Sequence, residues 1–394
     1  MRTLTRASIF SIAALLSATA ALAQEVEGGG EAEADTGIDW SVGLRGSYAA
    51  NSITGGKPSL ALTPEASLTL GGESSTTTYG AGSELVVDGT GQARVSDLHA
   101  GVTSTLRLGA TTTLEGSING ALTQMDRDDS SLPANTLIAP LEIDGTARGS
   151  VTQDMGKVDA TLTLDGERYI RGPTTLGDLS TVDNSDKSFW EGGATLRLGY
   201  ELTPLFGAFI EGEASGQKFD AADPTLLKFL DGREYQLRAG LSYTYGSIVD
   251  AEASIGRGWL DYLDGTLTDT QSWVYNGSVT FRPDETLSLT GALQTSMDPS
   301  ANTPGDTDVG VTLSGNAAYT VNPWLTLRAS GAWDRTVTLG TGDNSWSLDA
   351  GVGVDYRSSR HIVWSADYMY GRDYAPPVPL NDTHTVSVGV RVNR

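Results

Sequence analysis

The chain has 394 residues, and its 49 acidic residues outnumber its 26 basic residues, which gives a formal net charge of −23. This acidity makes nucleic acid and other polyanions poor partners and favours cations. Cysteine is absent, which excludes a disulfide framework, and with only three histidines a zinc site is not expected either. We therefore expect no metal and no cofactor.

The first 23 residues have the three parts of a secretory signal peptide. Arg2 and Arg6 supply positive charge, residues 9–22 are apolar, and Ala21-Leu22-Ala23 fits a small-residue cleavage site. The apolar part is too short for a membrane-spanning helix. Residues 24–37 are acidic and glycine-rich without periodicity, which is typical of a flexible leader. The remainder, residues 38–394, reads as one domain.

From residue 40 onward, apolar residues recur at every second position. In residues 346–356 the alternate positions are Trp346, Leu348, Ala350, Val352, Val354 and Tyr356, and the residues between them are polar or glycine. A period of two predicts strands, and no segment has a sustained helical period. The chain is therefore predicted to be all-β. Such a chain can enter a membrane only as a closed barrel, because a barrel leaves no backbone polar group unpaired in lipid.

The strands are expected to form hairpins. Tight turns are predicted near residues 71–72, 109–110, 155–156, 202–204, 246–247, 283–284, 322–323 and 358–359. Longer polar loops are predicted at 125–142, 171–188, 219–232, 263–270, 299–308, 337–345 and 373–383. Short turns at one end and long loops at the other are typical of an outer-membrane barrel. Eight hairpins, with a first strand at 40–48 and a last at 384–392, predict a transmembrane antiparallel up-and-down barrel of about 18 strands; 16 is the alternative, because the 89–92 loop is very short.

Aromatic residues near the strand ends give an independent indication of a membrane. The residues predicted at the two membrane interfaces are Trp190, Tyr200, Tyr245, Trp273, Phe281, Tyr319, Trp333, Trp346 and Tyr356. Ten residues separate Trp190 from Tyr200, which at ~3.3 Å per residue and a tilt of ~45° corresponds to about 23 Å along the barrel axis. The apolar band of such barrels is ~25 Å tall and flanked by aromatic girdles. We expect the apolar face to contact outer-membrane lipid; the alternative, a soluble β-sandwich or β-helix, would not repeat this hairpin length with aromatics at both ends.

This arrangement of signal peptide, strands and girdles resembles the bacterial outer-membrane porins, most closely the putative β-barrel porin-2 family, over residues 38–394. The resemblance implies a channel in the outer membrane rather than an enzyme, and it makes a trimer possible, although the sequence leaves the oligomeric state open. Barrels of this kind usually end on an aromatic residue that the barrel assembly machinery recognises. This chain ends on Arg394 instead, which leaves its recognition by that machinery open.

The residues that alternate with the apolar positions are predicted to line the barrel. The arginines among them are Arg45, Arg107, Arg148, Arg197, Arg238, Arg328 and Arg391. The acids are Glu65, Glu84, Glu115, Asp144, Asp159, Asp165, Glu167, Glu191, Glu201, Asp250, Glu252, Asp349 and Asp367. This excess of acids predicts a wet wall and passive diffusion of small hydrophilic solutes or ions with a mild preference for cations. The alternative is that the charges pair into ladders that brace the wall without selectivity.

An 18-stranded barrel encloses more space than side chains fill, so a loop must supply any narrowing. The candidate is the Gln124–Glu142 loop, which joins Asp126, Asp128 and Asp129 to an apolar stretch. General porins constrict their channel with the third loop, and the resemblance implies the same here. The alternatives are an external loop that packs on its neighbours, or constriction by the 171–188 loop.

Catalysis is not expected, because none of the histidines lies in a loop beside a plausible nucleophile. His361 falls at a tight turn, His384 opens the last strand, and His99 is predicted to face inward. Two other functions stay open. One is an export conduit for an anionic or neutral exopolysaccharide; the acid excess argues against an acidic polymer. The other is a closed structural barrel or adhesin.

Overall fold

The computed structural model describes residues 37–51, 55–127, 132–133, 135–300, 306–375 and 380–394. The predicted signal peptide lies outside the described residues, as does the predicted leader except for Gly37, which begins the first strand. No helix within the described residues is long and apolar enough to cross a membrane.

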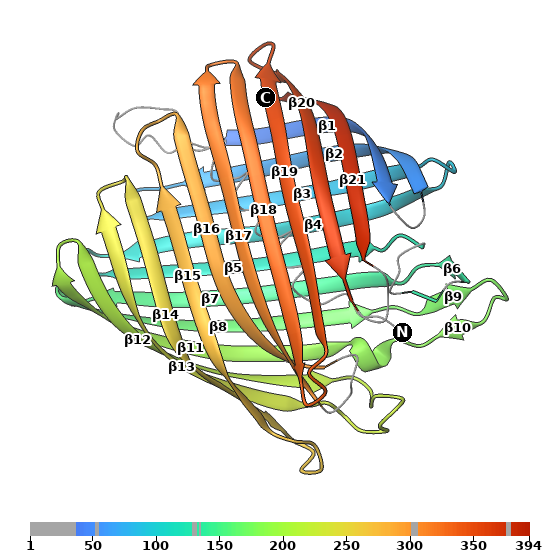
Figure 1. Ribbon diagram of the computed structural model, residues 1–394. Helices are drawn as coiled ribbons and strands as arrows, with labels where there is room; N and C mark the ends of the chain where they lie inside the picture. The colour runs from blue at the N-terminus through green and yellow to red at the C-terminus, as the bar shows by residue number, and fades with distance from the viewer. Residues whose placement is uncertain (1–36, 52–54, 128–131, 134, 301–305, 376–379) are drawn as a thin grey trace.

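Eighteen strands form one antiparallel sheet that closes into a barrel, as predicted (Figure 1). The sheet closes because β1 (Gly37–Asn51) pairs with β2 on one side and with the last strand, β21 (Asn381–Asn393), on the other. The other barrel strands are β2 (Gly55–Gly71), β3 (Ser75–Asp88), β4 (Ala93–Leu108), β5 (Thr112–Gln124), β7 (Leu141–Asp154), β8 (Val158–Arg171), β11 (Phe189–Thr203), β12 (Phe206–Phe219), β13 (Gly232–Tyr245), β14 (Val249–Tyr262), β15 (Thr270–Phe281), β16 (Leu287–Pro299), β17 (Thr307–Asn322), β18 (Leu325–Leu339), β19 (Asn344–Arg357) and β20 (Ile362–Tyr374). Because β3 and β4 are both full strands, the 16-strand alternative is excluded.

Each predicted tight turn separates two neighbouring barrel strands, and both described chain ends lie on this short-turn side. The turns form because their residues fit them. Gly156 and Gly246 have positive φ values of 88° and 56°, a backbone conformation that costs glycine little. At the β15–β16 turn, the Asp284 carboxylate accepts hydrogen bonds from the Thr286 amide at 2.8 Å and hydroxyl at 2.6 Å. These bonds lower the pKa of Asp284 below its ordinary value and fix the turn.

The long loops at the opposite end contain structure that the sequence did not predict. A second sheet joins β6 (Thr136–Ile138), β9 (Thr174–Leu176) and β10 (Thr181–Val182), and a short 3₁₀ helix, η1 (Ser185–Lys187), follows it. Figure 1 places these strands beyond the ends of β7 and β8. The expected 337–345 loop is shorter than predicted, because β18 runs on to Leu339 and β19 begins at Asn344.

The register keeps apolar residues on one face from strand to strand. Leu196 on β11, for example, pairs with Leu162 on β8 and with Gly212 on β12. Leu196, Leu162 and the girdle residues Trp190 and Tyr200 are all exposed to the surroundings of the barrel. Large apolar side chains on the outside of a barrel whose alternate residues are polar identify the outer face as the one that contacts lipid.

The barrel wall bends sharply between β13 and β14. Gly256 on β14 pairs with Arg238 on β13, and a Cβ atom at Gly256 would meet the Leu237 carbonyl oxygen and lie 2.7 Å from the Arg238 Cα. Only glycine permits this approach of two backbones. The bend brings the inner side chains of β11 to β14 together, and these form the site described next.

Candidate channel wall

The predicted lining residues lie on the face opposite to the exposed apolar residues. Arg197, for example, lies between Leu196 and Leu198 on β11 and pairs with Glu211 on β12. The residues predicted to line the channel are placed as follows: Arg45 on β1, Glu65 on β2, Glu84 on β3, Arg107 on β4, Glu115 on β5, Arg148 on β7, Asp165 on β8, Glu191 and Arg197 on β11, Arg238 on β13, Glu252 on β14, Arg328 on β18, Asp349 on β19 and Asp367 on β20. This placement is the basis of the channel proposed below.

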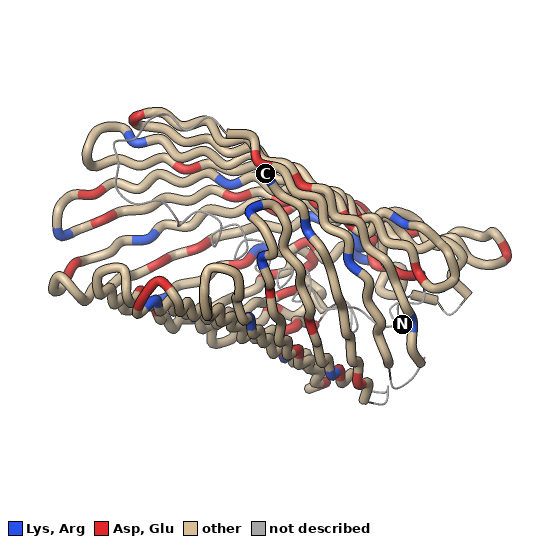
Figure 2. The backbone as a smooth tube through the Cα atoms, turned by 90° about the horizontal axis from the view of Figure 1, so that it is seen from above, with Lys and Arg blue, Asp and Glu red and all other residues tan. Residues whose placement is uncertain are grey.

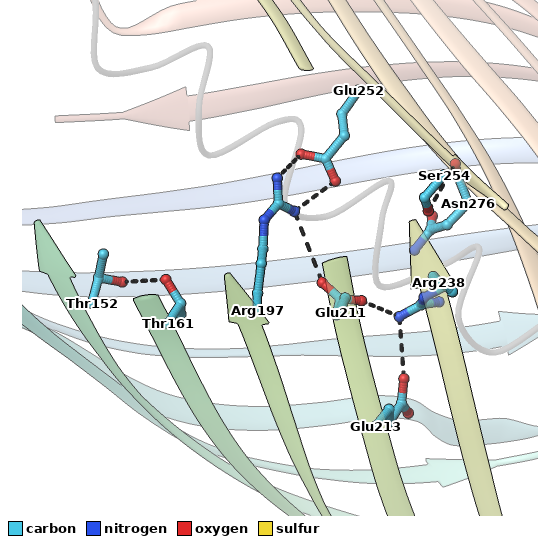
Figure 3. Close-up of polar contacts among 9 residues, drawn as sticks. All are labelled: Thr152, Thr161, Arg197, Glu211, Glu213, Arg238, Glu252, Ser254 and Asn276. Atoms are coloured by element: carbon cyan, nitrogen blue, oxygen red, sulfur yellow. Dashed lines mark hydrogen bonds and ion pairs between the residues drawn. The ribbon is translucent and has the colours of Figure 1, made fainter. Parts of the chain in front are cut away.

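Five of the inner side chains form one connected set, which we call the inner network: Arg197, Glu211, Glu213, Arg238 and Glu252 (Figure 3). The Arg197 guanidinium bonds Glu252 through two nitrogen–oxygen contacts of 2.7 and 2.5 Å and lies 3.9 Å from Glu211. Arg238 donates to Glu211 and, at 3.2 Å, to Glu213. Three carboxylates and two guanidinium groups leave the network with one net negative charge.

The inner network shows how strongly the wall curves. Arg197 is on β11 and Glu252 is on β14, three strand positions away. In a flat sheet three strand intervals span about 14 Å, which is beyond the reach of this pair once their offset along the strands is added. The contact therefore requires both residues to lie on the concave, inner side of the bent wall. Arg238, a member of the network, is buried, with 9% of its surface exposed.

Two further arginines on this face are also held by carboxylates. Arg328 on β18 lies 2.8 Å from both Asp355 on β19 and Asp367 on β20. Arg45 on β1 lies 3.0 Å from Glu84 on β3. Arg45, Arg197, Arg238 and Arg328 thus act as bridges between strands, and each of these four positive charges is set against at least one negative charge.

An acidic recess lies at the loop end of the inner wall. We define it by Glu191 on β11, Glu234 on β13 and Asp298 on β16. Gln217 donates to Glu191 at 3.2 Å, and Gln236 donates to Glu234 at 2.6 Å. No basic side chain is among the described residues that line this recess.

The base of the predicted constriction loop is tied to the wall at the channel mouth. Arg94 on β4 donates to the Gln124 carbonyl oxygen at 2.6 Å and lies 3.9 Å from Asp126. Arg171 on β8 lies 3.5 Å from Glu142. Further along the loop, β6 pairs with β9 of the next loop. The other acids of the prediction, at positions 128 and 129, lie outside the described residues.

Several residues of this wall were missed by the sequence reading, namely Glu211, Glu213, Glu234, Asp298 and Asp355. Asp355 has a clear signal, since it alternates with Val354 and Tyr356. Glu211 and Glu213 have a weak one, because the outward positions of β12 are mostly alanine and glycine rather than large apolar residues.

The histidines make structural contacts. The His99 Nδ1 lies 2.5 Å from Asp97, the His361 Nδ1 lies 3.0 Å from the Asn393 carbonyl oxygen, and the His384 Nδ1 lies 2.8 Å from the Tyr368 hydroxyl. In the part of the chain that the structure describes, no group of three or more histidine, aspartate or glutamate residues is placed to hold a metal ion.

Comparison with known proteins agrees with this architecture. Residues 65–394 match the family model described as "Putative beta-barrel porin 2". No curated protein matches the sequence.

Similar solved structures include OccK5 (OpdH) of Pseudomonas aeruginosa, with a TM-score of 0.44, 12% identity and coverage of 91% of this chain and 98% of that chain. Another is the outer membrane protein OpdK of Pseudomonas aeruginosa, with a TM-score of 0.44, 10% identity and coverage of 91% and 99%. OccAB4 of Acinetobacter baumannii has a TM-score of 0.41, 12% identity and coverage of 91% and 98%. Because the family model covers most of the chain, the protein belongs to the beta-barrel porin 2 family and is an outer-membrane porin.

Proposed function

We propose that this porin lets small hydrophilic solutes diffuse passively and that it prefers cations mildly. The observation that carries the preference is the acidic recess of Glu191, Glu234 and Asp298 at the loop end, with no basic side chain among its described lining residues. Charged groups in a water-filled pore set ion preference by direct electrostatics. A cation that enters from the loop end would meet this negative charge early, and diffusion requires no cofactor or covalent step.

Four of the inner arginines do not offset this bias. Arg45, Arg197, Arg238 and Arg328 are each in contact with a carboxylate, so their charge is already compensated. The inner network keeps one net negative charge, and so does Arg328 with Asp355 and Asp367. Acidic residues recur on strands around the whole barrel, while basic residues are fewer (Figure 2). The charge pairing that braces the wall is thus compatible with a negative potential inside it.

The test is the reversal potential of single channels across a potassium chloride gradient, measured for the protein and for a Glu191→Gln/Asp298→Asn double variant. We expect the double variant to form channels whose potassium preference is weaker, because the carboxylates of Glu191 and Asp298 are removed from the acidic recess.

The matched control is a Glu73→Gln/Glu285→Gln double variant. Both residues lie exposed in short turns, so the same charge is removed outside the channel wall, and selectivity should stay that of the unmodified protein. Equal selectivity in the two double variants would contradict the role given to the recess. A correctly folded barrel without conductance would favour the closed structural barrel instead.

A further inference from the structure

The lipid-facing surface of the barrel has a charge opposite to that of the whole protein. On the outward faces of the described barrel strands, the basic side chains are Arg168, Lys218, Arg233, Arg257, Arg335 and Arg372. The acidic ones are only Asp261 and Asp382. The chain as a whole has 49 acidic and 26 basic residues, so this reversal is not explained by composition.

All of these basic residues lie in the half of their strand that is nearer the long loops. Lys218 is next to the last residue of β12, and Arg233 is next to the first residue of β13. Arg257 is in the last part of β14, which ends at Tyr262. In barrels with short periplasmic turns and long external loops, this end lies at the outer leaflet of the membrane.

Lys218, Arg233 and Arg257 lie on the outward faces of the neighbouring strands β12, β13 and β14, and two of them pair with tryptophan. Lys218 pairs with Trp190, and Arg257 pairs with Trp273. The Arg257 guanidinium lies over the Trp273 ring, 4.6 Å from the ring centroid. Arg233 lies between them: it pairs with Gly216, two residues from Lys218 on β12, and with Asp261, four residues from Arg257 on β14, so the three cations are spread along the wall. We call Lys218, Arg233, Arg257, Trp190 and Trp273 the basic–aromatic patch.

The cations of this patch have no acidic partner in the described part of the protein. Ion pairs within 4 Å join Arg168 to Asp220 and Arg372 to Asp382, but none includes Lys218, Arg233 or Arg257. Asp261, the cross-strand neighbour of Arg233, makes no such pair either. A charged side chain near hydrocarbon is costly unless it reaches the interface or an opposite charge. Trp190 and Trp273 lie beside Lys218 and Arg257, and because tryptophan is enriched at the membrane interface, we place these cations at the headgroup level.

We propose that the basic–aromatic patch binds the phosphate groups of a phosphorylated glycolipid in the outer leaflet. Guanidinium groups bind phosphate oxygens through two parallel hydrogen bonds, and lysine adds a point charge. The neighbouring tryptophan rings contact the sugar and the upper acyl chains, since their rings are apolar with a polar edge. This site is independent of what passes through the channel, because it lies on the opposite face of the wall.

The test is native mass spectrometry of the full-length protein in a neutral detergent, titrated with bisphosphorylated lipid A, with the same lipid after its phosphates have been removed, and with phosphatidylglycerol. We expect tight binding of the phosphorylated lipid A only. A Lys218→Gln/Arg233→Gln/Arg257→Gln variant should lose roughly tenfold or more in affinity, because charge-assisted hydrogen bonds are lost. The single variant Arg257→Lys keeps the charge without the forked donors, and it should bind more weakly than the protein but more tightly than Arg257→Gln.

The matched control is a Lys157→Gln/Arg282→Gln/Arg360→Gln variant, which removes the same charge from the short turns at the other end of the barrel. Its affinity for phosphorylated lipid A should equal that of the protein, and both triple variants should keep the protein's single-channel conductance as evidence of folding. Equal binding of the dephosphorylated lipid, equal binding of phosphatidylglycerol, or equal loss in the two triple variants would overturn the proposal. If the triple patch variant does not fold, the comparison of Arg257→Lys with Arg257→Gln decides.

Discussion

Arg238 holds two carboxylates of neighbouring strand β12 on the inner wall. It is buried and donates to Glu211 and Glu213, so its removal leaves Glu213 without an ion pair to a described residue and Glu211 with Arg197 alone. Breaking a buried pair by removing one partner is strongly destabilising. We predict that Arg238→Met lowers the free energy of unfolding by about 3 kcal/mol, measured by urea titration of the detergent-refolded barrel.

Arg107 on β4 provides the control for this prediction. It is exposed, and it makes no ion pair with a described residue. Arg107→Met should therefore change the free energy of unfolding by about 0.5 kcal/mol or less. If the two variants lose the same stability, the inner network does not brace the wall.

The residues of the wall were predictable only to a limited extent. The alternation of Arg197 with Leu196 and Leu198 indicates its face, because a strand reverses side-chain direction at each residue. Its partner was not predictable, since Glu252 is three strands away and reaches Arg197 only because the wall bends at Gly256. The outward arginines such as Arg257 were missed because one charged residue among alternating apolar residues does not change the period of two.

At the scale of elements, the Gln124–Glu142 loop is proposed to narrow the channel mouth, since Arg94 and Arg171 tie its base to the inner wall. Replacing residues 127–139 by a short Gly-Ser linker should then raise the single-channel conductance. Replacement of residues 221–230, the β12–β13 loop, should change conductance less, because that loop is not tied to Arg94 or Arg171. Equal conductance after the first replacement would mean that the loop only packs on its neighbour.

The elements were far easier to predict than the contacts between loops. Strands such as β19 must keep one face in lipid over their whole length, which imposes the alternation seen from Trp346 to Tyr356. Strand β6 has three residues and exists because it pairs with β9 of the next loop. So short a strand has no periodicity of its own, and its position depends on tertiary contacts.

At the scale of the whole molecule, charge is sorted by surface. Acids and bridging arginines such as Arg197 and Arg328 line the inner wall. The outward face bears tryptophan and, near the loop end, cations such as Arg257 that make no ion pair with a described residue. The alternation of inward and outward residues along the strands thus gives the barrel two surfaces of opposite net charge. The proposed preference for cations belongs to the inner surface, and the proposed binding of anionic headgroups belongs to the outer surface.

The most direct test of the central claim is the reversal potential of the unmodified protein in a planar bilayer under a potassium chloride gradient. An acid-lined aqueous channel predicts stable openings and a reversal potential whose sign shows that potassium passes more readily than chloride. A reversal potential of the opposite sign would mean that arginines dominate the narrowest part of the channel, and it would contradict the account.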